Sequence, residues 1–303
     1  AHYIALCYGG GNLGALSMDS PGFTPDENNY FEIRNAEDES PYIQVDKYGA
    51  LVVDGVDYTQ IKGIKIIQGE QANYQSALMC GVSSTIDNIT IERCWVECQD
   101  VTYDASTHNR TVFRVYWAGN GDITIQNKVV ILRKRSSSAS YTHAGILVRC
   151  VDSGNGGNCY LYNNTIFATE YPVYWYGGTN SSNRVNVDSK NNVAFWTDGN
   201  VPSTGKCYYA WNAGYSNLIW DIEQDYCVSQ DDSADDWGGS NNIINATLSD
   251  CFSDYSSDDF TPKIGGILYD TGVTISSVTE DYLGNSRPMG SGYDIGAYEQ
   301  ISI

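Results

Sequence analysis

The fold is decided by the stretch Ile123-Thr-Ile-Gln-Asn127-Lys-Val-Val130. Apolar and polar residues alternate from Ile123 onward, which is the period of a β-strand with one buried face. Asn127 interrupts the alternation, and asparagine tolerates a left-handed backbone that turns the chain without a long loop. Apolar residues resume at Val129, so the stretch predicts a strand, a tight corner and a second strand.

Segments of this kind recur along the chain at a loosely fixed period. We mark each segment by the residue that aligns with Ile125. These residues are Ile61, Ile91, Ile125, Leu161, Ser189, Ile222 and Leu248, which stand 30, 34, 36, 28, 33 and 26 residues apart. A β-propeller blade needs four strands in about 40–45 residues, whereas each of these periods is shorter and carries two or three short strands. The period therefore favours a parallel β-solenoid, in which each coil buries its inner face against its neighbours.

The solenoid predicts which side chains stack inside it. We expect one line of inward residues with a rise of about 4.8 Å per coil. These residues are Ile61, Ile91, Ile125, Leu161, Ile222 and Leu248. The same alignment places Asp225 at an inward or corner position, where a carboxylate without a partner is costly.

The composition agrees with an all-β protein. The 303 residues include 24 Tyr, 30 Gly and 7 Pro, and runs of helix-forming residues are hard to find. This length can bury a full core as a single domain without a metal or disulfide framework. The net charge of −20 argues against nucleic acid and anionic membranes as partners, because both demand a basic face. The sequence also shows neither an apolar stretch long enough to span a membrane nor an uncleaved signal peptide.

The nine cysteines show no metal-binding spacing. There is no Cys-x-x-Cys pair, and Cys94 and Cys98 have no histidine near them. We therefore expect no metal and no cofactor, and we predict buried, unpaired thiols, since a free cysteine behaves as a small hydrophobic residue. The prediction names Cys80, Cys94, Cys150, Cys227 and Cys251.

Two segments resemble the coils of right-handed parallel β-helix proteins of the pectate-lyase-like group: Asn88-Ile-Thr-Ile-Glu-Arg-Cys94 and Gly121-Asp-Ile-Thr-Ile-Gln-Asn127. The ending, Asp281 to Pro288 followed by Asp294-Ile-Gly-Ala-Tyr-Glu299, is similar to the closing segment of many secreted, surface and bacteriophage β-helix proteins. The resemblance implies an all-β, right-handed parallel β-helix. We expect an N-terminal entry strand and cap over 1–55, coils over 56–280 and a C-terminal closing segment over 281–303.

Many proteins with this fold cleave acidic polysaccharides, so the resemblance raises the question of catalysis. The lyases use Ca²⁺ held by clustered carboxylates and an arginine base, but Arg93, Arg114, Arg149 and Arg184 are isolated here. Polygalacturonase-like hydrolases use three Asp on adjacent coils and a His in a Gly-His-Gly word.

The chain offers three candidates for this chemistry: the pairs Asp231-Asp232 and Asp258-Asp259, and His143. Serines flank or precede both Asp pairs, so we interpret them as solvated loop carboxylates. We expect His143 to cap a turn or to satisfy a hydrogen bond. The sequence therefore predicts no catalytic residue.

Two sets of charged residues each allow two interpretations. Asp231, Asp232, Asp235 and Asp236 are either Ca²⁺ ligands or, as we favour, a solvated loop. The basic run Arg133-Lys134-Arg135 is either a solvated coil edge, which we favour, or a docking place for an acidic neighbour.

An aromatic group has two interpretations as well. Its members are Tyr171, Tyr174, Trp175, Tyr176, Tyr208, Tyr209 and Trp211. Flat apolar rings with polar rims suit sugar rings, so the group is either an outward platform for carbohydrate or, as we favour, an internal or interface stack.

These observations favour a non-catalytic structural component of an extracellular particle, and we place it in a bacteriophage virion as a capsid decoration or tail protein. The alternatives are a polysaccharide lyase or glycoside hydrolase, and a surface carbohydrate-binding or adhesive module. The expected location is a virion or the extracellular space. The expected partners are other virion or surface proteins, a second copy of the chain, or a polysaccharide.

Overall fold

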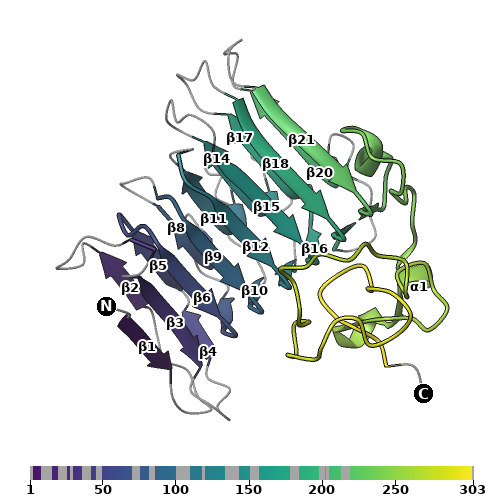
Figure 1. The fold of residues 1–303 in the computed structure, drawn as a ribbon, viewed down its shortest axis with the longest axis horizontal. Helices are drawn as coiled ribbons and strands as arrows, with labels where there is room; N and C mark the ends of the chain where they lie inside the picture. The colour runs from purple at the N-terminus through teal and green to yellow at the C-terminus, as the bar shows by residue number, and fades with distance from the viewer. Residues whose placement is uncertain are drawn as a thin grey trace.

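Three parallel β-sheets wind around one core in the computed structural model (Figure 1). The structure describes residues 3–7, 16–19, 26–27, 30–35, 42–45, 50–69, 76–81, 86–99, 110–117, 120–133, 143–150, 157–177, 184–197, 202, 205–212 and 219–301. Each complete coil contributes one strand to each sheet, and every strand pairs with its counterparts in the neighbouring coils. This arrangement is a right-handed parallel β-helix.

The first sheet has eight strands. They are β1 (Tyr3–Cys7), β3 (Phe31–Asn35), β6 (Thr59–Lys62), β9 (Ile89–Glu92), β12 (Ile123–Gln126), β15 (Asn158–Tyr162), β18 (Arg184–Lys190) and β21 (Ile219–Asp225).

The second sheet has seven strands. They are β4 (Tyr42–Val45), β7 (Lys65–Gln68), β10 (Trp95–Cys98), β13 (Val129–Leu132), β16 (Thr165–Ala168), β19 (Val193–Trp196) and β22 (Val228–Ser229).

The third sheet also has seven strands. They are β2 (Leu16–Asp19), β5 (Leu51–Asp54), β8 (Leu78–Cys80), β11 (Arg110–Trp117), β14 (His143–Cys150), β17 (Tyr171–Gly177) and β20 (Tyr208–Asn212).

The corner between the first and second sheets confirms the role predicted for asparagine. Asn127, Asn163 and Asn191 have positive φ angles of 50°, 52° and 56°. The residue after each corner points inward and is fully buried, and in two coils it is also an asparagine. Asn164 Oδ1 accepts the Lys128 N–H at 3.0 Å, and Asn192 Oδ1 accepts the Asn164 N–H at 3.0 Å. This internal ladder satisfies buried amide groups that would otherwise cost free energy.

The predicted inward line is correct for its first four members. Ile61 pairs with Ile91, Ile91 with Ile125, and Ile125 with Leu161, and all of them are buried. The expected position of Ile222 is wrong by two residues, because Ile222 pairs with Val187 and Gln224 is the residue that pairs with Ser189.

The error arose at the corner of the last coil. Tyr226, at φ 53°, makes this turn in place of an asparagine, and Cys227 takes the inward position after it. Asp225, which the alignment had placed inward or at the corner, accepts the Asn241 N–H at 3.1 Å and is only half-buried.

Leu248 is not in a coil at all. The coil strands end at β22, and the residues that follow, 230–301, form a C-terminal segment with little regular structure. Its elements are η1 (Ser233–Asp235), α1 (Leu248–Cys251), β23 (Phe252–Asp254), η2 (Tyr255–Ser257) and β24 (Asp259–Pro262). The strand ladders therefore begin at Tyr3 and end at Ser229, whereas the sequence assigned the coils to 56–280. In the described part of the chain no helix is long and apolar enough to cross a membrane.

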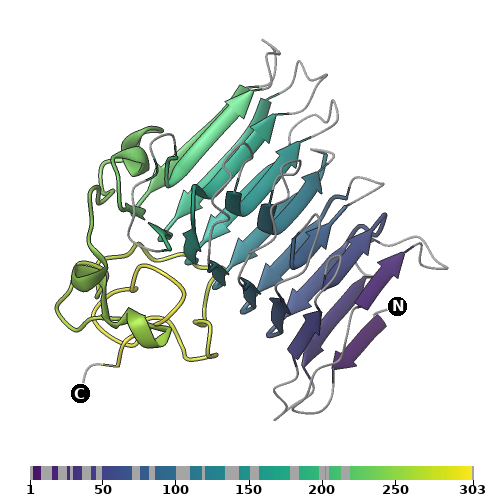
Figure 2. The ribbon, with the colours of Figure 1, turned by 180° about the vertical axis from the view of Figure 1, so that it is seen from behind.

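The C-terminal segment runs back along the flank of the helix, beside β10 and β16 (Figures 1 and 2). It covers the outer face of the second sheet, where Trp95, Phe167 and Phe195 pack against Phe252 and Phe260. The two segments that resemble a closing segment, 281–288 and 294–299, thus belong to the part of the chain that covers the side of the coils. We call this C-terminal segment the lateral cover.

Polar contacts from the coil corners fasten this cover. The Asn127 side-chain amide donates to Glu280 O at 2.7 Å, that of Asn163 to Asp294 O at 3.2 Å, and that of Asn191 to Val273 O at 2.7 Å. The corner asparagines therefore serve two purposes, since they turn the chain and bind the segment that lies over them.

The prediction about thiols is confirmed for most of the cysteines whose side chains are described. Eight of them are buried, and six of these are unpaired, namely Cys80, Cys94, Cys159, Cys207, Cys227 and Cys251. The eight buried cysteines are Cys80, Cys94, Cys98, Cys150, Cys159, Cys207, Cys227 and Cys251. Most of them fill the solenoid interior as small apolar side chains.

Candidate functional site

The outer face of the third sheet carries rings and cations at regular spacing. On β11, Phe113 and Val115 point into the core, so the residues of the other phase, Arg114 and Tyr116, point outward. The register of the sheet then places Tyr116, Arg149, Tyr176 and Trp211 side by side on four successive coils. We call these four residues, together with Arg114, the arginine–aromatic row.

Each guanidinium in the row lies against a ring. The Arg149 guanidinium carbon is 5.1 Å from the centroid of Tyr116 and 5.0 Å from that of Tyr176. Arg114 lies 4.6 Å from the Tyr116 ring, and the Trp211 ring lies 5.1 Å from that of Tyr176. These are cation–π and ring–ring distances, so the row is a continuous stack in which arginines alternate with aromatic side chains.

Two arginine nitrogens in the row make no hydrogen bond within the described part of the chain. The Nε atoms of Arg114 and Arg149 are buried and have no hydrogen-bond partner among the described residues. Burial lowers the pKa of Arg114, yet an arginine remains charged at any physiological pH. Trp211 is 43% exposed, so the end of the row at β20 is open to solvent. A ligand can therefore reach the Trp211 ring at this end of the row.

A tyrosine cluster borders the row. The Tyr171 ring lies 5.2 Å from that of Tyr174 and 4.9 Å from that of Tyr209, and all three are nearly parallel. Burial raises the pKa of Tyr171 to about 12 and that of Tyr174 above its usual range. Both phenols therefore stay protonated at neutral pH, and the Tyr171 phenol is already hydrogen-bonded to Glu170.

The structure divides the aromatic group that the sequence had treated as one. Trp175 and Tyr208 point inward, are fully buried and stack at 6.3 Å, as the internal interpretation expects. The other five members lie on the outer face, where Tyr174 is buried among its neighbours and Trp211 is exposed. The sequence interpretation missed the arginines beside them, although Arg149 and Tyr176 each alternate with buried residues of their strands and thus share the outward phase.

Asp231 proves to be a structural residue. Its carboxylate accepts the Cys207 N–H at 3.1 Å and the Ser233 hydroxyl at 2.6 Å, so it closes the turn after the last coil. Asp236 pairs with Lys206 at 2.6 Å, while Asp232 and Asp235 are exposed. Within the described residues, no group of three or more His, Cys, Asp or Glu side chains is placed to hold a metal ion.

The second aspartate pair also has partners in its own chain. Asp258 makes two hydrogen bonds to the Arg133 guanidinium, at 2.6 and 2.7 Å, and Arg133 Nε donates to Glu97 at 2.8 Å. Asp259 accepts the Thr261 N–H at 3.0 Å. The first residue of the basic run thus holds the C-terminal segment to the coils, and Lys134 and Arg135 lie outside the described residues.

His143 lies at the start of β14 and is 3% exposed. Its backbone N–H donates to Glu170 Oε2 at 3.0 Å, and its Nδ1 is 3.6 Å from the same oxygen. The hydrogen bond is therefore made by the backbone of His143, while its buried Nδ1 has no hydrogen-bond partner among the described residues, so the role expected for the side chain is not shown. Neither Asp pair shares a contact with it.

The three parallel sheets and the row on the outer face of the third sheet define the class of protein. It is a right-handed parallel β-helix with an arginine–aromatic surface. No model of a known protein family and no curated protein matches the sequence. A comparison with solved structures finds the pectate lyase Pel9A, which is 13% identical. The alignment covers 98% of this chain and 86% of that one, with a TM-score of 0.44.

Proposed function

We propose that this protein binds acidic polysaccharide on the arginine–aromatic row without cleaving it. The observation that carries the proposal is Arg149, whose guanidinium lies between the rings of Tyr116 and Tyr176. A guanidinium recognises a carboxylate or sulfate through paired N–H donors, and a flat ring accepts the apolar face of a sugar. Alternating the two along a sheet matches a chain of sugar rings that carry acidic groups.

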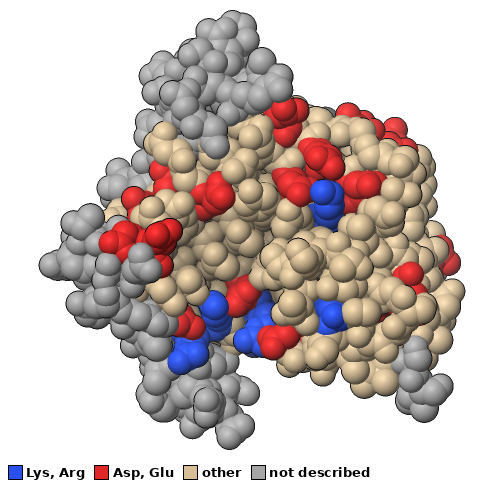
Figure 3. Space-filling model, viewed as in Figure 1, with Lys and Arg blue, Asp and Glu red and all other residues tan. Residues whose placement is uncertain are grey.

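The distribution of charge supports an acidic ligand on this face. On the first sheet, acidic side chains lie close to the basic ones, as Figure 3 shows. There Lys190 pairs with Asp188 at 2.9 Å, and Lys62 pairs with Glu92 at 3.1 Å. Arg114 and Arg149, in contrast, form no ion pair within the described part of the chain. Their positive charge is available to a ligand, despite the net charge of −20.

The residues of the row favour binding over cleavage. A glycosidase places two carboxyl groups about 5–9.5 Å apart across the sugar chain. The row consists of arginines, tyrosines and a tryptophan, and two of the aspartates considered as catalytic candidates, Asp231 and Asp258, are engaged in a turn and an ion pair elsewhere. A binding role is therefore the simpler use of this face.

A role on an extracellular particle, such as a bacteriophage virion, is a further part of the proposal. It is supported by the eight buried thiols, because proteins that fold in oxidising compartments commonly pair their cysteines. A particle that assembles in a reducing cell and then meets a polysaccharide outside it would need both features. Other virion or surface proteins, or a second copy of the chain, are the partners we propose for such a particle.

The test is binding of polygalacturonate, alginate and hyaluronate, measured by affinity electrophoresis and calorimetry. We expect at least one to bind, and we expect Arg149→Ala and Tyr176→Ala to weaken binding about tenfold or more, or about 1.4 kcal/mol. Arg149→Lys should also bind weakly, because a lysine loses the planar stacking geometry. Lys190→Ala removes one positive charge from the first sheet and serves as the matched control.

Two results would contradict the proposal. If none of the three polysaccharides binds, the row is not a polyanion site. If a reducing-end assay detects cleavage by the purified protein, the lyase or hydrolase alternative replaces the binding role.

A further inference from the structure

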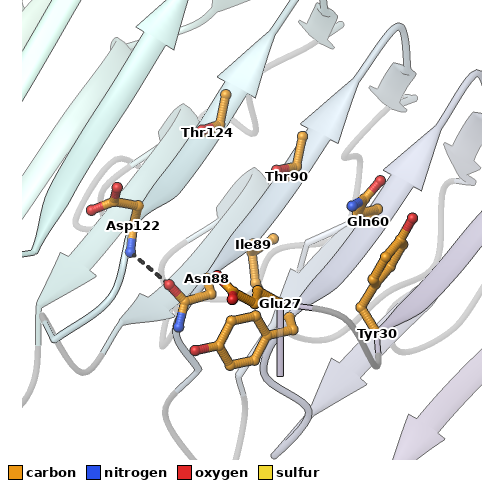
Figure 4. Close-up of a pocket in the computed structure, with 9 residues that line it drawn as sticks. Glu27, Tyr30, Gln60, Asn88, Ile89, Thr90, Asp122 and Thr124 are labelled. Atoms are coloured by element: carbon orange, nitrogen blue, oxygen red, sulfur yellow. Dashed lines mark hydrogen bonds between the residues drawn. The ribbon is translucent and has the colours of Figure 1, made fainter. Parts of the chain in front are cut away.

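A hollow lies on the outer face of the first sheet, away from the arginine–aromatic row. It has a volume of about 380 Å³, within the range of small-molecule sites. Its lining includes Tyr58. Figure 4 labels further lining residues, among them Glu27, Tyr30, Gln60, Asn88 and Asp122. Nothing in the proposed function uses this hollow.

Adjacent strands form the floor of the hollow. Gln60 on β6 pairs in register with Thr90 on β9, and Thr90 pairs with Thr124 on β12. All three are half-buried and project from the sheet into the hollow (Figure 4). The floor is therefore a row of short amide and hydroxyl groups, which both donate and accept hydrogen bonds.

The polar wall is held in place by hydrogen bonds between coils. Asn88 Oδ1 accepts the Asp122 N–H at 3.2 Å, as Figure 4 shows. Asp122 Oδ1 in turn accepts the N–H and the side-chain amide of Asn158, at 3.1 and 2.9 Å. The wall is thus fixed before any ligand arrives, which lowers the entropic cost of binding.

Tyr58 is in an unusual conformation for its residue type. Its φ angle is 53°, and the corresponding position in the next coil is Asn88 at φ 57°. Asparagine tolerates the left-handed region, whereas a bulky side chain there is uncommon and strained. The backbone therefore gives no reason for a tyrosine at this position, but its place in the lining of the hollow does.

We infer that this hollow binds an uncharged sugar. The rings of Tyr30 and Tyr58 offer apolar surfaces, while Gln60, Asn88 and the threonines offer partners for hydroxyl groups. Among the described residues, the lining contains two carboxylates, Glu27 and Asp122, and no lysine or arginine. Such a lining repels an anionic ligand, so its ligand differs in charge from the one proposed for the third sheet.

The experiment uses saturation-transfer NMR and titration with maltose, cellobiose and lactose as the probes. We expect at least one of these disaccharides to bind the full chain. Tyr58→Asn and Gln60→Ala should weaken that binding at least tenfold. Tyr58→Asn should not lower the Tm, because asparagine suits the left-handed backbone, and this separates loss of binding from loss of folding.

Tyr160→Ala is the matched control, because Tyr160 pairs with Thr124 on the same face but does not line the hollow. Binding of polygalacturonate should be unchanged in all three variants, so failure here is distinct from failure of the proposed function. The inference is overturned if none of the three disaccharides binds, or if binding survives both Tyr58→Asn and Gln60→Ala.

Discussion

Replacing Arg287 by alanine should loosen the C-terminal segment from the coils. The Arg287 side chain is completely buried and forms an ion pair with Glu299, which is also buried. Its Nη2 donates to Asn127 Oδ1 at 3.1 Å and to Gly296 O at 2.8 Å. Its remaining bonds go to the carbonyl oxygens of Glu280 and Asp294, at 3.3 and 3.2 Å. One side chain thus joins three parts of the segment to a coil corner.

The size of the effect follows from what the substitution leaves behind. In Arg287→Ala, Glu299 stays buried without its cation and keeps only backbone partners, the N–H groups of Met289 and Asp294, both at 3.0 Å. Removing one partner of a buried ion pair typically costs about 3–5 kcal/mol, because a buried charge remains uncompensated. We expect a loss of this size in the free energy of unfolding.

Arg93→Ala provides a matched control. Arg93 also joins a coil to the C-terminal segment, through an ion pair with Glu280 at 2.7 Å, but both side chains are substantially exposed. An exposed pair contributes about 0–1 kcal/mol. Urea unfolding gives the two free energies, and hydrogen exchange at the N–H of Gly296, which donates to Asn191 O at 2.8 Å, reports local detachment. If Arg287→Ala costs no more than Arg93→Ala, the buried network does not hold the segment.

Two further predictions concern the corner and the core. Asn163→Gly removes the amide that donates to the segment, and Asn163→Ala also forces an alanine into the left-handed region, so alanine should be the less stable variant by about 1–2 kcal/mol in urea unfolding. Lys128→Met should stabilise the protein at pH 7 by up to about 3 kcal/mol, since the fully buried amine lies against the Phe113 ring without a hydrogen bond and burial lowers its pKa to about 8. Between pH 8 and about 10.5 the Lys128 amine is neutral in the folded state and still protonated in the unfolded state, so the wild-type protein gains stability as pH rises over that range and the advantage of methionine should shrink by pH 10.5. An advantage that is equal at both pH values would contradict the assignment.

The sequence was sufficient for the repeat and its corners but not for the register of the last coil. The asparagines at 127, 163 and 191 were readable because few other residues tolerate their backbone conformation. Tyr226 makes the same turn without that signature, so an alignment based on corner residues slipped by two positions there. The repeat was then extended to Leu248, where the coils have already ended.

The outward surfaces were harder to predict than the core. Strand parity places Tyr176 and Arg149 outward, but a composition-based grouping had joined Tyr176 with Trp175 of the opposite phase. The contacts of Arg287 with Asn127 join positions 160 residues apart, and no periodicity links them. Lys128 lies within the repeat, but its burial was not predicted, because a lysine in a repeat is normally assumed to face solvent.

The lateral cover sets a rule for how this protein can change in length. Its polar contacts fall on the successive corners Arg93, Asn127, Asn163 and Asn191, so a coil duplicated among them would shift the later corners by about 4.8 Å and break their bonds. At Gly63, the corner before Arg93, an added Cβ would meet no atom of the described residues within 4 Å. Gain or loss of whole coils through duplication or recombination is therefore expected on the N-terminal side of Arg93, while the coils beyond it are inherited as a fixed block with their cover.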